Sequence, residues 1–339
     1  MRHSKLIFIS SALLLTGFLS LGGWAQDSNS RPAKPGSINY VEGQASVDNQ
    51  ALSSSSVGSA ELQPGQSVTT QAGKVEILLT PGVFLRVAEN SAVKMIRPEL
   101  ATTEVEVDKG RAMVEATDIR KQNDILIDVN GTNAKILKNG LYEFDADENS
   151  IRVFKGKAEV HDGGQKVDLG QGRQVVLNSG AKLKAEDFDA RKYQDDDFYR
   201  WSGLRAGYLS EASVDEARRY VNGGAGWYGP GWYWDPWFAS YTYIPGGGIL
   251  YSPFGWGFYS PFEVYRSPFF YGYYGQPHRF GEFHYPYGHG FESHGGFRGP
   301  VVRGGAPQVP RAGGVTGGGG ARGPQVPRAG GAVRGGGRR

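Results

Sequence analysis

The chain of 339 residues contains no cysteine, which excludes a disulfide scaffold, a cysteine-ligated zinc site and a thiol nucleophile. It also contains no H-E-x-x-H, G-x-S-x-G or Walker pattern, so no familiar motif indicates an enzyme. Glycine, in contrast, is abundant at 52 residues, far above the roughly 7% of an average protein. Part of the chain is therefore not expected to pack as an ordinary domain, although a hydrophobic content of 39% suffices for one core.

The N-terminus has the layout of a secretory signal peptide. A basic start at residues 2–5 precedes an apolar run at 6–21, and Gly23 and Ala25 occupy the −3 and −1 positions of a cut before Gln26. The alternative is an uncleaved anchor, because the run approaches the roughly 20 residues that span a bilayer.

Both interpretations take the chain out of the cytoplasm. We expect residues 1–25 to be the signal segment, residues 26–35 a linker, and the remainder to reside in the periplasm, in the outer envelope or outside a bacterial cell.

Residues 36–180 have the pattern of one β-domain. Short segments alternate apolar and polar side chains, the period of a strand with one buried face, and turn signals such as Asn139-Gly140 and Asp162-Gly163 separate them. Examples of the predicted strands are Ile38–Val41, Lys74–Leu79, Val83–Val87, Glu104–Val107, Asp124–Val129, Leu141–Phe144, Ile151–Phe154 and Gln174–Leu177. We expect a β-roll, a sandwich or a short β-solenoid, with a core that includes Val75, Ile77, Leu79, Val83, Leu85 and Val87.

Several segments of this domain carry a resemblance through their spacing. They are G-Q-A-S-V at 43–47, L-Q-P-G-Q-S-V-T-T at 62–70, G-K-V-E-I-L at 73–78, P-G-V-F-L-R-V at 81–87, G-L-Y-E-F at 140–144, V-F-K-G-K-A-E-V at 153–160 and L-G-Q-G at 169–172. This pattern resembles the FecR-type extracytoplasmic domain. The resemblance implies an all-β domain outside the cytoplasm that has no catalytic residues.

The best-known FecR proteins relay an iron-siderophore signal across the inner membrane to a sigma factor. Those relays use a cytoplasmic segment before their membrane span, whereas only residues 1–5 precede the apolar run here. The resemblance is therefore expected to indicate the fold and an interaction role rather than sigma regulation.

Residues 181–221 are predicted to form an amphipathic helical linker. A capping box at Ser213–Glu216 predicts a helix start, Gly223 predicts its end, and Asp195–Asp197 are expected to be a solvated face or a cap rather than a metal site. We expect this helix to cover an open face of the β-domain. Apolar side chains recur at spacings of three to five: Phe188, Tyr193, Phe198, Trp201 and Leu204.

Residues 222–297 contain 27 of the 42 aromatic side chains, interleaved with Gly, Pro and Ser. Because proline removes backbone donors and glycine raises the entropic cost of ordering, we expect neither a regular sheet nor a helix in this segment. Two interpretations remain open. The segment either condenses on itself or on the β-domain through ring contacts, or it is a passive low-complexity linker.

Residues 298–339 are predicted to be a disordered tail rich in Arg, Gly and Pro, in which P-Q-V-P-R-A-G-G at 307–314 recurs at 324–331. The tail has eight arginines and no acid, whereas residues 36–180 have 15 basic and 20 acidic side chains, a net charge of −5. The export signal favours envelope polymers or extracellular DNA over cytoplasmic nucleic acid as the polyanion. The candidate polyanion-binding residues are Arg298, Arg303, Arg311, Arg322, Arg328, Arg334, Arg338 and Arg339.

Two groups of residues partly resemble metal sites. Asp145, Asp147 and Asn149 resemble the start of a calcium loop, but Ser150 and Gly156 stand where that loop needs Gly and Glu, so a hairpin turn is the better interpretation. Imidazoles also bind zinc, copper or nickel, but the spacing of the tail histidines matches no rigid frame, so no cofactor is expected. These weak metal candidates are His278, His284, His289 and His294.

Three functional hypotheses follow. The first is an exported, non-enzymatic envelope protein whose β-domain is an interaction module and whose aromatic and cationic tail binds envelope or matrix polyanions or other envelope proteins. The second is an extracytoplasmic sensor related to the FecR sigma-factor regulators, held at the membrane by an uncleaved N-terminal segment. The third, an envelope hydrolase or metal-dependent enzyme, is supported only by the tail histidines.

Overall fold

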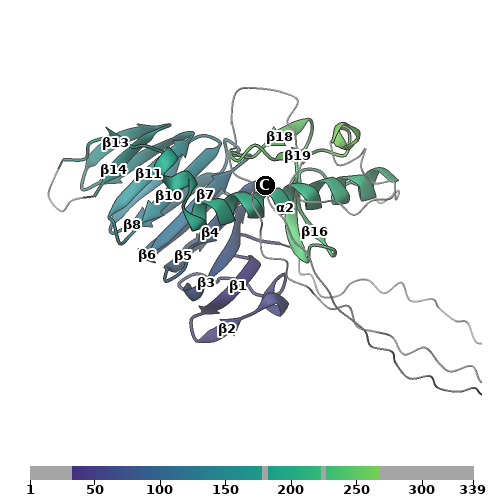
Figure 1. Cartoon of the computed structure of the whole chain (residues 1–339), viewed down its shortest axis with the longest axis horizontal. Coiled ribbons are helices and arrows are strands. Elements are labelled where there is room, and N and C mark those ends of the chain that lie inside the picture. The colour runs from purple at the N-terminus through teal and green to yellow at the C-terminus, as the bar shows by residue number, and fades with distance from the viewer. Residues whose placement is uncertain (1–32, 178–181, 223–226, 268–339) are drawn as a thin grey trace, which may run out of the picture. The chain divides into compact units, whose positions relative to one another are not determined.

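The computed structural model describes residues 33–177, 182–222 and 227–267 (Figure 1). These residues form a large curled β-sheet, one long helix and two small β-hairpins. The predicted signal segment, the four tail histidines and the eight tail arginines lie outside the described residues.

Fifteen strands form the main sheet. They are β1 (Ile38–Val47), β2 (Gln50–Leu52), β3 (Ser67–Thr80), β4 (Val83–Val87), β5 (Ala92–Pro98), β6 (Thr102–Lys109), β7 (Arg111–Ala116), β8 (Asp124–Val129), β9 (Thr132–Ile136), β10 (Gly140–Asp145), β11 (Ser150–Lys155), β12 (Lys157–Asp162), β13 (Gln165–Gly170), β14 (Arg173–Val176) and β15 (Glu186–Asp187). The eight predicted strands all coincide with observed ones, apart from Leu177, which follows β14. The examples did not include β2, β5, β7, β9, β12, β13 and β15.

The long strand β3 joins the two halves of the sheet. Its first residues, Ser67–Thr69, pair with β5, and its last residues, Val75–Thr80, pair with β4. One half continues from β5 through β6, β8, β9 and β12 to β13, and the other continues from β4 through β7, β10 and β11 to β14. Among the described strands, β6 and β8 are the only parallel pair.

The two halves curl around one hydrophobic core. In β6 the alternation is regular, with Val105 and Val107 buried and Glu104 and Glu106 half-buried. These valines belong to the same cluster as Leu85 on the opposite half. All six side chains predicted for the core are buried in this cluster, and the predicted mainly-β fold class is confirmed.

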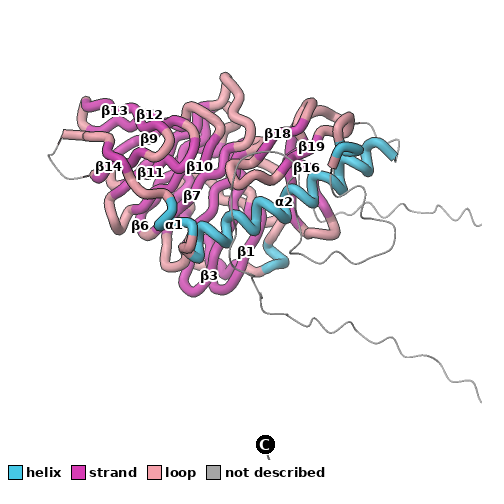
Figure 2. The backbone as a smooth tube through the Cα atoms, turned by 45° about the horizontal axis from the view of Figure 1, so that its top comes forward, coloured by secondary structure: helices cyan, strands magenta, loops and turns pink. Residues whose placement is uncertain are grey.

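Strands β4, β7, β10 and β11 differ from β6 because both of their faces are largely buried. Their inner face lies in the main core. Their outer face is covered by helix α2 (Asp197–Asn222), which runs along the sheet in Figure 1 and Figure 2. The prediction that a helix covers an open face of the β-domain is confirmed, because Phe198 and Trp201 pack with Met113 and Leu141 of the sheet.

The helix begins where an acidic side chain caps it. The Asp196 Oδ2 atom accepts a hydrogen bond from the backbone N–H of Tyr199 at 3.0 Å, which satisfies a free donor of the first turn. The short helix α1 (Arg191–Gln194) precedes this cap. Asp196 is therefore the cap that the sequence suggested as one alternative.

Two expectations for the helix are wrong. Ser213 does not start a helix, because α2 passes through it without interruption and the Ser213 hydroxyl accepts a hydrogen bond from Tyr259 N–H at 3.3 Å. Leu204 is 50% exposed, so it does not belong to the buried apolar face of the helix. Tertiary contacts along the helix, rather than local signals, decide both outcomes.

The expectation of no regular structure in the aromatic segment is also wrong, as far as its described residues show. Strands β16 (Gly231–Asp235) and β17 (Ser240–Ile244) form one hairpin, and β18 (Ile249–Tyr251) and β19 (Gly257–Tyr259) form another. Tyr243 and Phe258 are fully buried against Phe84 of the sheet and Leu209 of α2. Burial of these rings offsets the entropic cost of ordering a Gly- and Pro-rich chain.

Two glycines of α2 allow the second hairpin to approach the helix closely. A Cβ atom at Gly207 would lie 3.1 Å from Trp256 Cε2, and one at Gly203 would lie 3.2 Å from Phe254 Cδ1. The Trp256 indole N–H donates to the Gly203 carbonyl at 3.0 Å. The described part of the segment, residues 227–267, therefore docks on α2 and, through Tyr243 and Phe258, on Phe84 of the β-domain, which is one of the two interpretations left open by the sequence.

None of the helices in the described ranges combines the length and the apolar character needed to cross a bilayer.

Candidate functional site

The outer face beneath α2 carries a row of charged side chains. Glu76 of β3 is paired with Arg86 of β4, and Glu143 of β10 is paired with Arg152 of β11, with Met113 of β7 between the two pairs. Because side chains on neighbouring strands at paired positions share a face, these residues form one line across the sheet. On an uncovered sheet the same alternation would place them in water.

The first cluster in this line is sealed from solvent. The Arg86 Nε atom donates to Glu76 Oε2 at 2.9 Å, and Arg86 Nη1 donates to Glu115 Oε2 at 2.6 Å. All three side chains are 0% exposed. The helix contributes Arg205, whose Nη2 atom donates to Glu76 Oε1 at 3.0 Å and whose guanidinium lies 3.9 Å from the ring centroid of Tyr40.

Opposite charges decide the ionisation of this cluster. Burial alone raises the pKa of Glu76, but Arg205 and Arg86 outweigh it, so the pKa of that carboxyl lies below its usual value. Burial alone lowers the pKa of Arg86, but the charges of Glu115 and Glu76 outweigh the effect of burial, so the pKa of Arg86 lies above its usual value. The cluster is a set of fixed charges rather than a proton donor or acceptor near neutral pH.

Asn39 connects the first cluster to the aromatic hairpin. Its Nδ2 atom donates to Glu76 Oε1 at 2.9 Å and to the Tyr241 carbonyl at 2.9 Å, while its Oδ1 atom accepts from Tyr241 N–H at 2.7 Å. Strands β1, β3 and β17 are thereby joined through one fully buried amide.

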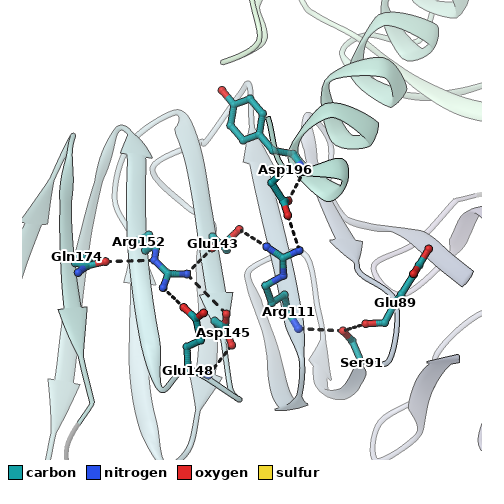
Figure 3. A network of polar contacts seen from close by, with 10 residues as sticks. Glu89, Ser91, Arg111, Glu143, Asp145, Glu148, Arg152, Gln174 and Asp196 are labelled. Atoms are coloured by element: carbon teal, nitrogen blue, oxygen red, sulfur yellow. Dashed lines mark hydrogen bonds and ion pairs between the residues drawn. The ribbon is translucent and has the colours of Figure 1, made fainter. Parts of the chain in front are cut away.

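The second cluster holds the start of α2 (Figure 3). Arg152 Nη1 donates to Glu143 Oε1 at 2.7 Å, and its Nη2 atom donates to Glu148. Arg111 Nη2 donates to Asp196 Oδ1 at 3.0 Å, and Arg111 Nη1 lies 3.8 Å from Glu143 Oε2. Burial raises the pKa of Glu143 even though Arg152 and Arg111 oppose the shift.

Taken together, the two clusters form an electrostatic clamp between sheet and helix. Arg86 and Arg152 bridge the strands, while Arg205 and Asp196 bring the helix into the network. Buried ion pairs of this kind fix one arrangement, because any displacement leaves a charge unpaired in a medium of low dielectric. The chemical role of these charges is to hold α2 in position against the sheet.

The residues weighed as metal ligands have other roles where the structure describes them. Asp145 accepts a hydrogen bond from Glu148 N–H at 2.8 Å, and Asp147 accepts one from Gly110 N–H at 3.0 Å. Asn149 has a positive φ of 52° in the turn between β10 and β11, as the hairpin interpretation requires. No group of three or more His, Asp or Glu side chains suited to a metal occurs within residues 33–177, 182–222 and 227–267.

Sequence reasoning missed the clamp. Glu76, Arg86, Glu143 and Arg152 occupy polar positions of alternating strands, which is the pattern of a solvated face. The sequence does contain a pattern that could have predicted the clamp. The outward-facing positions of neighbouring strands carry charges of opposite sign, and a helix with several aromatic residues follows them.

The hairpins also leave large aromatic side chains exposed. Trp237 in the turn between β16 and β17 is 83% exposed. Asp235 Oδ1 stabilises this turn by accepting a hydrogen bond from the backbone N–H of Trp237 at 2.7 Å. Among residues 227–267, the other exposed rings are Tyr228, Tyr251, Phe262 and Tyr265.

Comparisons with known proteins are consistent with the β-domain described above. Residues 66–159, from the start of β3 into β12, match the family model described as FecR protein. Among curated proteins there is no match.

Two crystal structures of a candidate anti-sigma factor from Parabacteroides distasonis are similar to part of the chain. The structure at 1.65 Å has 15% identity and a TM-score of 0.33, over 38% of this chain and 62% of that one. The structure at 2.50 Å has 17% identity and a TM-score of 0.32, over 37% of this chain and 61% of that one. The similarity spans less than two thirds of those chains. From the match of residues 66–159, the chain contains a FecR-type domain, to which helix α2 and the aromatic hairpins are clamped.

Proposed function

We propose that the chain is an exported, non-enzymatic envelope protein in which the FecR-type domain, α2 and the aromatic hairpins form one interaction module. The observation that carries the proposal is the buried clamp around Glu76, which receives hydrogen bonds from the sheet, from Arg205 of α2 and from Asn39, itself bonded to Tyr241 of the hairpin. A module held in this way presents its outer surface without a large entropic cost on binding.

The exposed rings of the hairpins supply a surface that suits a partner. Trp237 is 83% exposed and Tyr251 is 61% exposed. Aromatic side chains are enriched in protein interfaces, and large exposed apolar groups mark interaction sites. The proposed partners of this surface are other envelope proteins.

The arginine tail supplies the second part of the proposal, attachment to envelope or matrix polyanions. Its eight arginines at 298–339 have no acidic neighbours in that segment. Uniform positive charge concentrates polyanions at low ionic strength, and the attraction is screened by salt.

Binding of the full chain to double-stranded DNA, used as a model polyanion, tests the tail. If all eight arginines contact phosphates, the affinity should fall on the order of 10³-fold or more between low and physiological salt. Replacement of the eight arginines by glutamine should abolish this binding, whereas Trp237→Ala should not alter it. Binding that is insensitive to salt, or that survives the eightfold replacement, would contradict polyanion attachment.

The family match favours a second candidate, an extracytoplasmic sensor held at the membrane by an uncleaved N-terminal segment. This function requires that residues 1–25 remain on the chain. Mass spectrometry of the protein isolated from its native membrane decides between the two, because a mature N-terminus at Gln26 excludes the anchored sensor.

A further inference from the structure

One side of α2 packs against the hairpin formed by β16 and β17 (Figure 1). The ring of Tyr208 lies at a centroid distance of 6.2 Å from the ring of Phe238 in the turn, and the ring of Tyr220 lies 5.0 Å from that of Tyr233 in β16. Glu216 follows Tyr208 by eight residues and precedes Tyr220 by four, so it shares this side of the helix. Its carboxyl is therefore placed between two ring contacts with the hairpin.

Two carboxyls at this contact are buried, one from each element. Asp235, the last residue of β16, is 0% exposed, and Glu216 is 5% exposed. Asp235 Oδ1 accepts hydrogen bonds from the backbone N–H groups of Trp237 at 2.7 Å and Phe238 at 3.0 Å, which shapes the turn. Asp235 Oδ2 is buried without a hydrogen-bond partner among the described residues, so one acceptor remains for a donor from the helix.

The charges around Glu216 do not balance. Burial raises the pKa of Glu216 most, Arg219 opposes the shift, and Asp235 and Asp215 add to it, so that this pKa is about 7. Arg219 Nη1 lies 2.9 Å from Glu216 Oε1, but the Arg219 side chain is half exposed and water screens its charge. Arg218 Nη1 lies 3.6 Å from Asp215 Oδ1. With every group ionised, three carboxylates face two guanidinium groups.

The phenols at the same contact stay neutral. Burial raises the pKa of Tyr220 to about 12, and it also raises the pKa of Tyr233. Strand β17 contributes the uncharged residues Ser240 and Thr242 opposite β16. Glu216 is therefore the group that changes its charge near neutral pH at this contact.

The two strands of the hairpin are held unequally. All five residues of β17 are buried, and Asn39 exchanges two hydrogen bonds with the backbone of Tyr241. In β16 only Asp235 is buried, and the four residues before it are half-buried. In the turn, Ala239 has a φ of 46°, a left-handed conformation that is strained for a residue with a Cβ atom. Local opening of the hairpin therefore starts at β16 and the turn.

We propose that Glu216 and Asp235 form a pH-sensitive latch between α2 and the hairpin. While Glu216 carries a proton, its hydroxyl is a donor for the second oxygen of Asp235, and the pair has a single negative charge. Loss of that proton to solvent leaves two buried carboxylates at one contact, and the closed hairpin loses stability relative to a form in which β16 and its turn are open.

The latch deepens the proposed function and rests on it, because Trp237 in the turn belongs to the proposed partner surface. Acid keeps this surface assembled against α2, and a rise in pH above neutral releases it. The latch thus makes the interaction module responsive to the pH of the compartment that surrounds it.

Hydrogen exchange of the full chain, read by mass spectrometry at pH 5 and pH 8 without any partner, tests the latch. After correction for the intrinsic exchange rate at each pH, residues 231–239 should lose protection on the order of 50-fold between the two conditions. This is the linkage expected when the pKa of Glu216 falls from about 7 in the closed hairpin to its usual value near 4.5 in the open one. Because no partner takes part, failure of the latch is distinguishable from failure of the partner surface.

Three variants separate the latch from a general effect of pH. Glu216→Gln retains a donor of similar shape without a titrating proton, so protection of residues 231–239 should be equal at both pH values and as high as in the wild type at pH 5. The matched control Glu211→Gln alters another partly buried carboxyl of α2 and should leave the wild-type change intact. Asp235→Asn retains an acceptor for the turn but removes the like charge, and it should reduce the change.

The latch is overturned if protection of residues 231–239 in the wild type is independent of pH. It is also overturned if Glu216→Gln keeps the pH dependence or exchanges rapidly at both pH values. Peptides from β7 should remain protected at times when residues 231–239 have exchanged. Simultaneous exchange of both would report unfolding of the whole domain rather than opening of the hairpin, and would equally refute the proposal.

Discussion

Replacement of Arg86 by methionine removes the centre of the clamp beneath α2. Arg86 is 0% exposed and lies 2.9 Å from Glu76 Oε2 and 2.6 Å from Glu115 Oε2. Glu76 retains Arg205 and Asn39, whereas the other oxygen of Glu115 has no hydrogen-bond partner among the described residues. The substitution therefore leaves one carboxylate buried with no cation bonded to it.

The expected loss is about 3–5 kcal/mol in the free energy of unfolding, the cost typical of breaking a buried pair by removing one partner. Urea denaturation at neutral pH, followed by both tryptophan fluorescence and circular dichroism, measures it. The matched control is Lys94→Met, because Lys94 forms a half-exposed pair with Glu106 at 3.8 Å and should lose less than about 1 kcal/mol.

A double substitution separates the ion pair from packing. In R86M/E115M the orphaned carboxylate is gone, so at least about 2 kcal/mol of the loss should be recovered. Two outcomes would refute the reasoning. If R86M is within about 1 kcal/mol of the wild type, apolar packing alone holds the helix. If the double variant is no more stable than R86M, the loss comes from a packing defect.

Two further predictions concern the contacts of α2 with the hairpins. Burial first, and then the charges of Asp235 and Asp215, raise the pKa of Glu216 to about 7, although Arg219 opposes the shift. This pKa is higher in the folded state than in the unfolded state. The free energy of unfolding should therefore be greatest below about pH 4.5 and fall by about 3 kcal/mol as the pH rises through 7. Glu216→Gln should remove this dependence in thermal melts at pH 5 and pH 8, and an unchanged pH profile would show that Glu216 is ionised throughout. Gly207→Leu should displace Trp256, because Trp256 lies 3.1 Å from the position that a Cβ atom at Gly207 would take, and proteolysis of residues 245–260 should become faster. The control is Leu204→Ala, a substitution on the exposed side of α2. Equal digestion of the two variants would argue against close packing at Gly207.

The sequence determined the β-domain with little ambiguity. Period-two alternation in segments such as Lys74–Leu79 and Val83–Val87 identified both the strands and their core-facing side chains. The spacing of those segments also carried the FecR resemblance that the match of residues 66–159 bears out. Strand β7 was not among the example segments because its alternation is weak: Arg111–Ala116 includes two alanines and a glutamate, which have low intrinsic β-propensity.

The site was predicted less completely. The sequence indicated that a helix covers the sheet, and it offered Asp195–Asp197 as a possible cap, of which Asp196 fills that role. It did not reveal that Glu76 and Arg86 are buried, because polar residues in alternating strands ordinarily face water. The tail histidines and the tail arginines lie outside the described residues, and what was said of them stays a prediction.

The amino-acid order was sufficient for local features, namely the period of the strands and the turn residues. Which faces are covered depends instead on tertiary contacts. Glu76 is buried because Arg205, 129 residues later, lies over it, and the Gly- and Pro-rich hairpins are ordered because Tyr243 and Phe258 pack on Phe84. In both cases the free energy comes from contacts between distant segments, and short-range patterns do not encode contacts of that range.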